Sequence, residues 1–208
     1  MKIGIIGAGK IGGTLGRLFA EAGHEVAISN SRGPDTLSGL VAEIDHGVQA
    51  MTAQDAAGFG DIVVVSVPLH AYREIPVRET AGKIVVDTNN YYPGRDGQIP
   101  ELDDDSTTST ELLQAHLPES RVVKAFNAIM WKHLGNDGRP AADPERLGIP
   151  ISGDDEDAKR TVSELIDQIG FDPIDAGTLA DGGRRHQPGA PGYTMGTRTP
   201  QLRSLLRI

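Results

Sequence analysis

Short apolar runs alternate with longer amphipathic segments along most of the chain. The runs at 62–67 and 83–87 are almost continuous in β-branched residues, which is typical of strands that are covered on both faces. Strands that alternate with helices indicate a parallel sheet with helices on both sides, so the pattern predicts a doubly wound, three-layer α/β fold with a mostly parallel sheet. The predicted strands are 2–6, 25–29, 48–51, 62–67, 83–87, 121–126, 148–152 and 171–175. The predicted helices are 11–22, 35–44, 53–58, 70–80, 107–116, 128–134 and 155–169.

The length of 208 residues fits one α/β domain. We expect a core at about 1–152 and a short C-terminal extension at about 153–208. Residues 177–199 depart from the pattern, because glycine, proline and arginine dominate there and no periodicity is visible. This composition predicts either a long functional loop or a partly disordered segment.

Charge and composition narrow the range of partners. The formal net charge is −9, which argues against nucleic acids and anionic membranes, so an anionic ligand must be held by local groups. No apolar run is as long as a membrane span, and the apolar run at the start is too short for a signal peptide. The absence of cysteine excludes disulfides, thiol catalysis and thiolate metal sites. These features together predict a cytoplasmic protein whose partners are small molecules.

A glycine motif follows the first predicted strand and leads into a helix with an apolar face. Its residues are Gly7, Ala8, Gly9, Lys10, Ile11 and Gly12. In a Rossmann-type fold this turn brings the pyrophosphate of a dinucleotide to the N-terminus of the helix, where unpaired N–H groups and the helix dipole favour negative charge. Gly7 would form the tight turn, Gly9 would admit the pyrophosphate, and Gly12 would let the helix pack against the strand. The alternative is an ordinary turn between a strand and a helix.

The residues after the second predicted strand indicate which dinucleotide binds. They are Ser29, Asn30, Ser31 and Arg32. An NAD-binding chain usually places a carboxylate here, on the 2′-hydroxyl of the ribose, and a carboxylate would repel a 2′-phosphate. Hydroxyls, an amide and a guanidinium bind a phosphate instead. We therefore interpret the chain as an NADP(H) protein; the alternative is a polar loop in an NAD protein that lacks its acid.

The fourth and fifth predicted strands also end in polar residues, at the sheet edge where open α/β sheets bind ligands. Candidate cofactor contacts after the fourth strand are Ser66, Val67, Pro68 and His70. His70 is either a donor to a substrate oxygen or simply the start of the next helix. Asn89 and Asn90 follow the fifth strand, where two amides suit a carboxamide or carbonyl group, or else close a turn on their own backbone.

The sixth predicted strand leads into three further candidate cofactor contacts, Asn127, Ala128 and Ile129. Asn127 either caps the next helix or touches the hydride acceptor. Met130 and Trp131 could stack on a planar ligand, but a core or dimer contact explains them equally well. The segment 182–188 has the densest positive charge of this acidic chain, and it is either a site for a phosphate or carboxylate tail or a solvated loop.

No metal-binding spacing and no nucleophile elbow occurs in the chain. Only a short stretch follows the strand at 148–152, whereas hydroxy-acid dehydrogenases and imine reductases generally add a substantial helical domain that supplies a proton donor. A planar conjugated acceptor needs only to be held against the nicotinamide, because proximity and orientation lower the barrier and the cofactors carry the chemistry. The sequence therefore favours hydride transfer between two cofactors, without a catalytic side chain.

Four segments together resemble the NADPH-dependent coenzyme F420 reductases. These segments are 1–12, 29–34, 87–92 and 151–155. Relatives of that family include the cytosolic flavin/NADPH domain of the STEAP metalloreductases. The resemblance covers nearly the whole chain and is specific up to about residue 176.

The resemblance implies reversible hydride transfer between NADP(H) and C5 of the deazaflavin coenzyme F420, usually in a homodimer. It also implies that the deazaflavin lies near Pro68, Asn127 and Ile129. The chain departs from the archaeal F420 enzymes at Asn127, where they tend to have histidine, and at 182–192, which replaces an apolar helical C-terminus. Both departures lie on the acceptor side, so two alternatives stay open: an NADPH-dependent flavin or metal reductase, and a non-catalytic protein that senses NADP(H).

Overall fold

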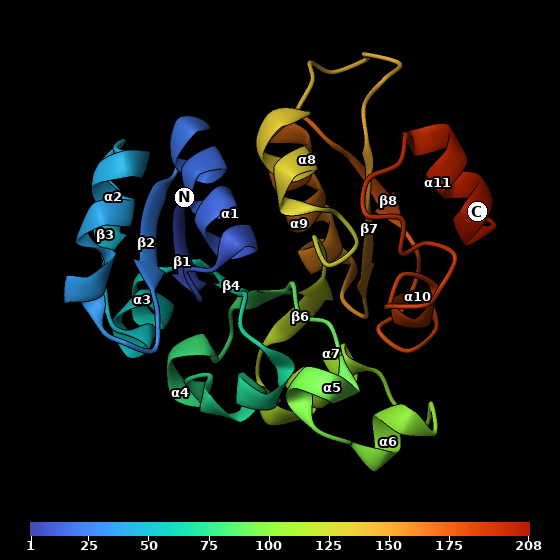
Figure 1. The fold of residues 1–208 in the computed structure, drawn as a ribbon, viewed down its shortest axis with the longest axis horizontal. Helices are drawn as coiled ribbons and strands as arrows, with labels where there is room; N and C mark the ends of the chain where they lie inside the picture. The colour runs from blue at the N-terminus through green and yellow to red at the C-terminus, as the bar shows by residue number, and fades with distance from the viewer.

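The computed structural model describes residues 1–208 and contains one eight-stranded sheet with the order β3-β2-β1-β4-β5-β6-β7-β8 (Figure 1). The strands are β1 (Lys2–Ile6), β2 (Glu25–Ser29), β3 (Gln49–Ala50), β4 (Ile62–Val65), β5 (Ile84–Asp87), β6 (Arg121–Lys124), β7 (Gly148–Gly153) and β8 (Asp172–Asp175). Strands β1 to β6 are parallel, as predicted. The strand order reverses between β1 and β4, which is where an open α/β sheet binds its ligands.

Helices cover both faces of the sheet. The α-helices are α1 (Lys10–Glu21), α2 (Ser38–Ile44), α3 (Ala53–Phe59), α4 (Val77–Thr80), α5 (Pro93–Asp96), α6 (Pro100–Asp103), α7 (Ser109–His116), α8 (Trp131–Asn136), α9 (Glu156–Gln168), α10 (Asp181–Arg185) and α11 (Thr199–Leu206), and the 3-10 helices are η1 (Pro34–Leu37) and η2 (Leu69–Glu74). Helices α1, α2, α8 and α9 pack on one face, whereas α3, η2 and α7 pack on the other. No helix is both long enough and apolar enough to cross a membrane.

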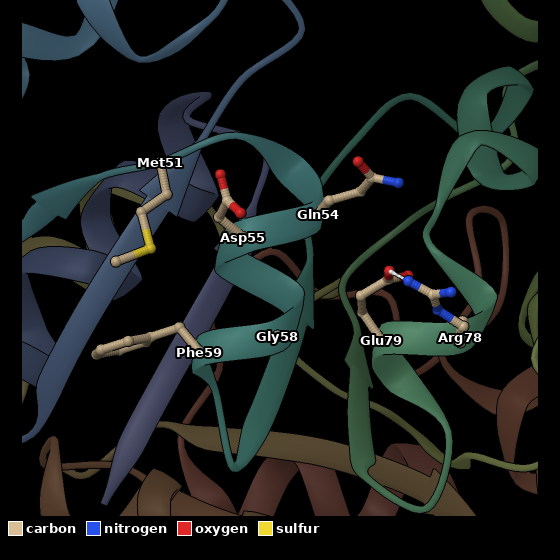
Figure 2. A pocket seen from close by; sticks show the side chains of 7 residues that line it. All are labelled: Met51, Gln54, Asp55, Gly58, Phe59, Arg78 and Glu79. Carbon is tan, nitrogen blue, oxygen red and sulfur yellow. Dashed lines mark hydrogen bonds and ion pairs between the residues drawn. The ribbon is translucent and has the colours of Figure 1, made fainter.

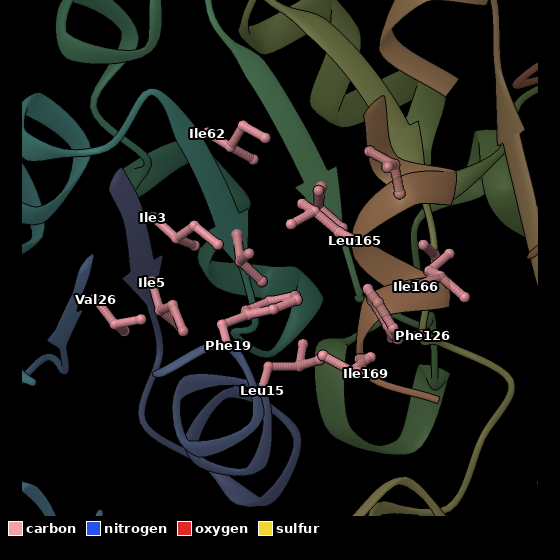
Figure 3. Close-up of a cluster of buried hydrophobic side chains, with 14 of the residues drawn as sticks. Ile3, Ile5, Leu15, Phe19, Val26, Ile62, Phe126, Leu165, Ile166 and Ile169 are labelled. Atoms are coloured by element: carbon pink, nitrogen blue, oxygen red, sulfur yellow. The ribbon is translucent and has the colours of Figure 1, made fainter. Parts of the chain in front are cut away.

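Alternate side chains of the central strands fill two apolar layers. Ile3 and Ile5 of β1 pack with Leu15 and Phe19 of α1, in the cluster that Figure 3 shows between the sheet and helices α1 and α9. The odd-numbered valines of β4 and β5 face the second layer, together with α3, η2 and α7. Every residue of β4 and β5 is buried, so the β-branched runs did predict strands covered on both faces.

The C-terminal extension continues the sheet. β7 pairs antiparallel with β6, and β8 pairs parallel with β7. Helix α9 covers one side of this pair and α11 covers the other. The segment 177–199 contains α10, and Gly182 and His186 in it are buried, so its interpretation as a partly disordered segment is wrong. Glycine allows this close packing, because a Cβ atom at Gly182 would lie 2.7 Å from Ser152 Oγ.

Three predicted helices differ from the observed ones. The predicted helix at 70–80 is divided into η2 and α4, because Pro76 has no N–H to donate and its ring clashes with the preceding turn. The prediction at 35–44 is divided into η1 and α2. The helix expected at 128–134 begins only at Trp131, since residues 126–128 form a bend and a turn.

Alanine substitutions at two adjacent glycines of α1 test how closely this helix approaches the turn after β1. A Cβ atom at Gly12 would lie 1.9 Å from the Gly7 carbonyl oxygen, so we expect Gly12→Ala to lower the free energy of unfolding by roughly 1–3 kcal/mol. At Gly13 the nearest atoms are 3.8 Å away, and Gly13→Ala should leave the free energy of unfolding unchanged or raise it by up to about 1 kcal/mol. Chemical denaturation of both variants measures the difference, and equal effects would contradict the close approach of α1 to the turn.

Candidate functional site

The glycine turn between β1 and α1 leaves room for a ligand at one position only. Gly7 has φ +110°, and a Cβ atom there would lie 2.0 Å from the Ser66 carbonyl oxygen. Gly12 is equally tight against Gly7. Gly9 is the residue that precedes α1. A Cβ atom there would have no other atom within 4 Å, so the backbone is open at this position. The open position lies next to the unpaired N–H groups of the helix, which suits a phosphate.

A cavity of about 560 Å³ runs from this turn along the carboxyl edge of the sheet. It is lined by Ile6, Gly7, Ala8, Gly9, Asn30, Ser31, Arg32, Ala53, Ser66, Val67, Pro68, His70, Ala71, Glu74 and Ile75. The structure thus brings together residues that follow three different strands, as the sequence predicts. Among the predicted contacts that do not line the cavity are Lys10, Ile11, Gly12, Ser29, Asn89, Asn127, Ala128 and Ile129.

The side-chain amide of Asn30 holds the polar loop after β2 in place. Asn30 Oδ1 accepts a hydrogen bond from the Arg32 N–H group at 2.9 Å, and Asn30 Nδ2 donates to Thr36 Oγ1 at 2.9 Å. The side chains of Ser31 and Arg32 remain exposed at the cavity. Ser29 is different, because it is buried and its hydroxyl donates to the Ile5 carbonyl oxygen at 3.1 Å. The predicted role of the Ser29 hydroxyl in a phosphate clamp is therefore wrong.

The opposite rim of the cavity is fixed by Asp96 of α5. Its carboxylate accepts hydrogen bonds from the Arg95 guanidinium at 2.8 Å and from the Tyr92 N–H group at 2.9 Å, and it lies 3.2 Å from His70 Nδ1. Burial raises the pKa of Asp96, but these hydrogen bonds outweigh burial and hold the pKa at about 2. The carboxylate therefore ties the loop after β5 to the turn after β4. His70 lies at this rim with an exposed ring.

Asn89 is held by three hydrogen bonds and keeps one unused donor. Its N–H group donates to Asp87 Oδ1 at 2.9 Å, its carbonyl oxygen accepts from Lys124 Nζ at 2.9 Å, and its Oδ1 accepts from the Val67 N–H group at 3.1 Å. Its Nδ2 is buried and has no partner. A buried donor without a partner is costly, so this amide is suited to a ligand that supplies an acceptor.

Asp87 and Lys124, which the sequence analysis did not single out, form a buried ion pair beneath Asn89. Their register positions on β5 and β6 are opposite, and Lys124 Nζ lies 3.6 Å from Asp87 Oδ2. Ser109 and Thr110 of α7 also accept hydrogen bonds from Lys124 Nζ. Burial lowers the pKa of Lys124, and Asp87 offsets this in part. The sequence did contain a signal for this pair, because oppositely charged residues stand at the last positions of two neighbouring apolar strands.

Asn127 is occupied by His186 and is not free to face the cavity. His186 Nδ1 donates to Asn127 Oδ1 at 2.9 Å, and Asn127 Nδ2 donates to the His186 carbonyl oxygen at 2.8 Å. Ser152 Oγ lies 2.6 Å from His186 Nε2. Burial lowers the pKa of His186 and the Lys124 charge adds to this effect; together they bring the pKa to about 3, so the ring stays neutral. The interpretation of 182–188 as a solvated or anion-binding loop is therefore wrong for this histidine.

A second cavity of about 770 Å³ lies between α3 and α4 (Figure 2). Its lining residues are Met51, Gln54, Asp55, Gly58, Phe59, Arg78 and Glu79. Arg78 and Glu79 pair with each other at 3.4 Å, as the dashed line in Figure 2 marks. None of the residues predicted from the sequence lines this cavity, and no buried polar group faces it without a partner. The cavity at the glycine turn is therefore the candidate site.

Comparison with known proteins relates the N-terminal part of the chain to one family. Residues 2–91 match the family described as NADP oxidoreductase, coenzyme F420-dependent. The F420-dependent NADP reductase of Methanocaldococcus jannaschii is 32% identical over 143 residues, which are 65% of this chain and 62% of that protein.

Two further relatives cover more of the chain. The metalloreductase STEAP3 of Rattus norvegicus is 31% identical over 181 residues, which are 86% of this chain, but the chain spans only 34% of that protein's length. The solved structure of a hypothetical protein, SMa0349, from Sinorhizobium meliloti is 34% identical, with a TM-score of 0.81 over 96% of this chain and 95% of the other. The fold, including the C-terminal extension, therefore occurs in a solved relative.

Arg32 makes the choice between dinucleotides testable. Its guanidinium is exposed at the cavity, so Arg32→Ala should weaken NADPH binding by roughly 10-fold or more, while NADH binding changes little. The control is Ser29→Ala, whose hydroxyl is buried and which should not change the ratio of the two affinities. Calorimetric titration of both dinucleotides measures the ratio, and equal losses for NADPH and NADH would exclude a phosphate clamp at Arg32.

The Asp96 carboxylate gives a pH-dependent prediction. Because its pKa is lowered from 3.8 to about 2 on folding, it stabilises the protein above pH 4, and this contribution is lost as the pH falls towards 2. We expect Asp96→Asn to lower the free energy of unfolding by about 2 kcal/mol at pH 7, with the difference from wild type shrinking below pH 4. Denaturation at pH 7 and pH 3 measures it, with the exposed Asp35→Asn as control. A constant difference at both values would show that the charge is not involved.

Proposed function

Because this chain belongs to the F420-dependent NADP oxidoreductase family, we propose that it transfers a hydride between NADP(H) and a planar acceptor, with coenzyme F420 as the first candidate. The dinucleotide would occupy the cavity at the glycine turn. The family supports NADP(H) and oxidoreductase chemistry, and the acceptor is the part that we propose.

One observation carries the proposal: the cavity runs from the open Gly9 backbone to the exposed Arg32 side chain, with no carboxylate at the end of β2. The pyrophosphate would lie at Gly9, and Ser31 and Arg32 would bind the 2′-phosphate. The chain has a net charge of −9, so this local group of donors must supply the attraction for an anion.

The unpartnered Asn89 amide fits the other end of the dinucleotide. Its buried Nδ2 would donate to the ribose or to the carboxamide of the nicotinamide half, which supplies the acceptor that the protein lacks. The bound dinucleotide would supply the hydride, and the chain would hold the nicotinamide and the acceptor in position. The buried titratable groups nearby suit this role, because His186 stays neutral and Lys124 is fully paired. Neither group is placed to move a proton to a substrate.

The STEAP metalloreductase relatives favour a second candidate, an NADPH-dependent flavin or metal reductase. Their similarity covers 86% of this chain, which is more than the similarity to the F420 reductase covers. A flavin is also planar and conjugated, so the same positioning would serve it. The two candidates differ only in the acceptor.

Stopped-flow mixing separates the candidates. The protein is mixed with NADPH and either F420 or FMN, and the absorbance of the oxidised acceptor is followed. We expect the absorbance of F420 to disappear faster than that of FMN, because the resemblance to F420 reductases includes the segments that line the cavity. Turnover of FMN alone would favour the flavin reductase. Tight NADPH binding without reduction of either acceptor would overturn hydride transfer as the function.

A further inference from the structure

The segment 187–198, which joins α10 to α11 and which we call the strap, lies beside the turn after β6. The Met130 N–H group donates to the Met195 carbonyl oxygen at 2.9 Å, and Ile129 forms a parallel bridge with Met195. In Figure 1 the strap is the orange-to-red connection between the labels α10 and α11. The strap therefore runs along the acceptor-side residues that the sequence predicts.

Both ends of the strap are fixed. His186 anchors one end through its contacts with Asn127 and Ser152, and the Thr197 carbonyl oxygen accepts a hydrogen bond from the Gly148 N–H group at 2.9 Å at the other. Met195 has φ +61°, a left-handed conformation that is unfavourable in a non-glycine residue. The surrounding contacts hold this strained position, so the side chains of the strap are displayed at defined places.

Tyr193 of the strap is paired with Tyr92 of the loop after β5. The two hydroxyl groups share a hydrogen bond, and Asn90 Nδ2 donates to the Tyr193 hydroxyl at 3.4 Å. The pair has two hydroxyl protons, and the shared hydrogen bond uses one of them. The other proton has no acceptor in the protein. The pair therefore presents one free O–H donor.

The position of the pair follows from its contacts. Asn90 directly follows Asn89, whose side chain faces the turn after β4, whereas Asn90 Nδ2 donates to the Asn127 carbonyl oxygen at 2.8 Å on the side of β6. The tyrosine pair thus lies on the β6 side of Asn89, next to the rim of the dinucleotide cavity that Asp96 fixes. Tyr92 is 38% exposed, and the Arg95 guanidinium lies 5.0 Å from its ring centre. Because this guanidinium is paired with the Asp96 carboxylate, the feature that the tyrosine pair offers a ligand is the hydrogen-bond donor and not a net charge.

We propose that the Tyr92–Tyr193 hydroxyl pair selects the acceptor by donating a hydrogen bond to a carbonyl oxygen on its planar ring. This inference rests on the proposed hydride transfer. A hydride, which is one proton and two electrons, leaves the dihydronicotinamide, and NADPH becomes NADP⁺. The hydride bonds to an electron-poor ring atom of the acceptor, and the added electron pair delocalises onto a conjugated carbonyl oxygen, which solvent later protonates. A donor at that oxygen stabilises the charge that develops.

Tyr193 remains protonated at neutral pH, as a donor must. Burial raises the pKa of Tyr193, and the hydrogen bond with Tyr92 raises it further. The substrate class that this donor fits is a planar heteroaromatic ring with a pyrimidine-dione edge, as in deazaflavins and flavins. A bare metal ion offers no carbonyl to this donor.

The test compares tyrosine hydroxyls of the same chain. The double variant Tyr92→Phe/Tyr193→Phe removes both hydroxyls of the pair and keeps both rings, because either single variant would leave one hydroxyl free to donate. The control Tyr91→Phe removes a hydroxyl that is bonded to Asp103 and Ile99 instead. For wild type and both variants, NADPH binding is measured by calorimetry, thermal unfolding by circular dichroism, and single-turnover reduction of F420 and FMN by stopped flow at saturating concentrations.

We expect the double variant Tyr92→Phe/Tyr193→Phe to slow the single-turnover rate roughly 10- to 100-fold with the acceptor that wild type reduces, because a hydrogen bond to a developing charge is lost. Its NADPH affinity and unfolding temperature should stay at the wild-type values, and Tyr91→Phe should keep the wild-type rate. A wild-type rate in the double variant, or an equal loss in Tyr91→Phe, would overturn the inference and leave the proposed function intact. A wild type that binds NADPH but reduces neither acceptor would overturn both.

Discussion

A buried ion pair between Lys124 and Asp87 organises the carboxyl edge of the sheet. Burying two charges is costly unless they are paired and hydrogen-bonded, and leaving one of them alone costs about 3–5 kcal/mol. Here Lys124 also bonds to Ser109, Thr110 and the Asn89 carbonyl oxygen, so the ammonium is fully satisfied. In the same network, Asp87 accepts a hydrogen bond from the Asn89 N–H group. The orientation of the Asn89 amide is therefore linked to the stability of the sheet.

The candidate site has to bind an anion although the chain itself is negatively charged. The chain has a net charge of −9 and nevertheless has to attract a dinucleotide with several phosphate charges. In the binding mode that we propose, a few directed donors supply the attraction: the helix N–H groups at Gly9, the Arg32 side chain and the Asn89 amide. The Asp96 carboxylate, which fixes the rim, is neutralised by Arg95. Local donors outweigh the overall field because electrostatic interactions between exposed charges are screened beyond about 10 Å.

The C-terminal extension reaches the side of the sheet where we propose that the acceptor binds. Two strands and two covering helices continue the sheet, and the strap between α10 and α11 returns to the turn after β6. His186 makes this return specific, because both of its ring nitrogens and its carbonyl oxygen are bonded to residues of the core. A hydrophilic stretch rich in glycine and arginine thus ends in a neutral, buried histidine.

Local patterns along the chain were sufficient for the order of the strands, the glycine turn and the absence of an acid after β2, but they did not predict helices α5, α6, α10 and α11. These features depend on hydrophobicity, backbone freedom and charge within short stretches of consecutive residues, so they can be recognised from the sequence. The inward turn of Ser29, the Lys124–Asp87 pair, the capture of Asn127 by His186 and the meeting of Tyr92 with Tyr193 were decided by packing. They join residues far apart in the chain, and no local preference specifies which of several polar partners a buried group will find.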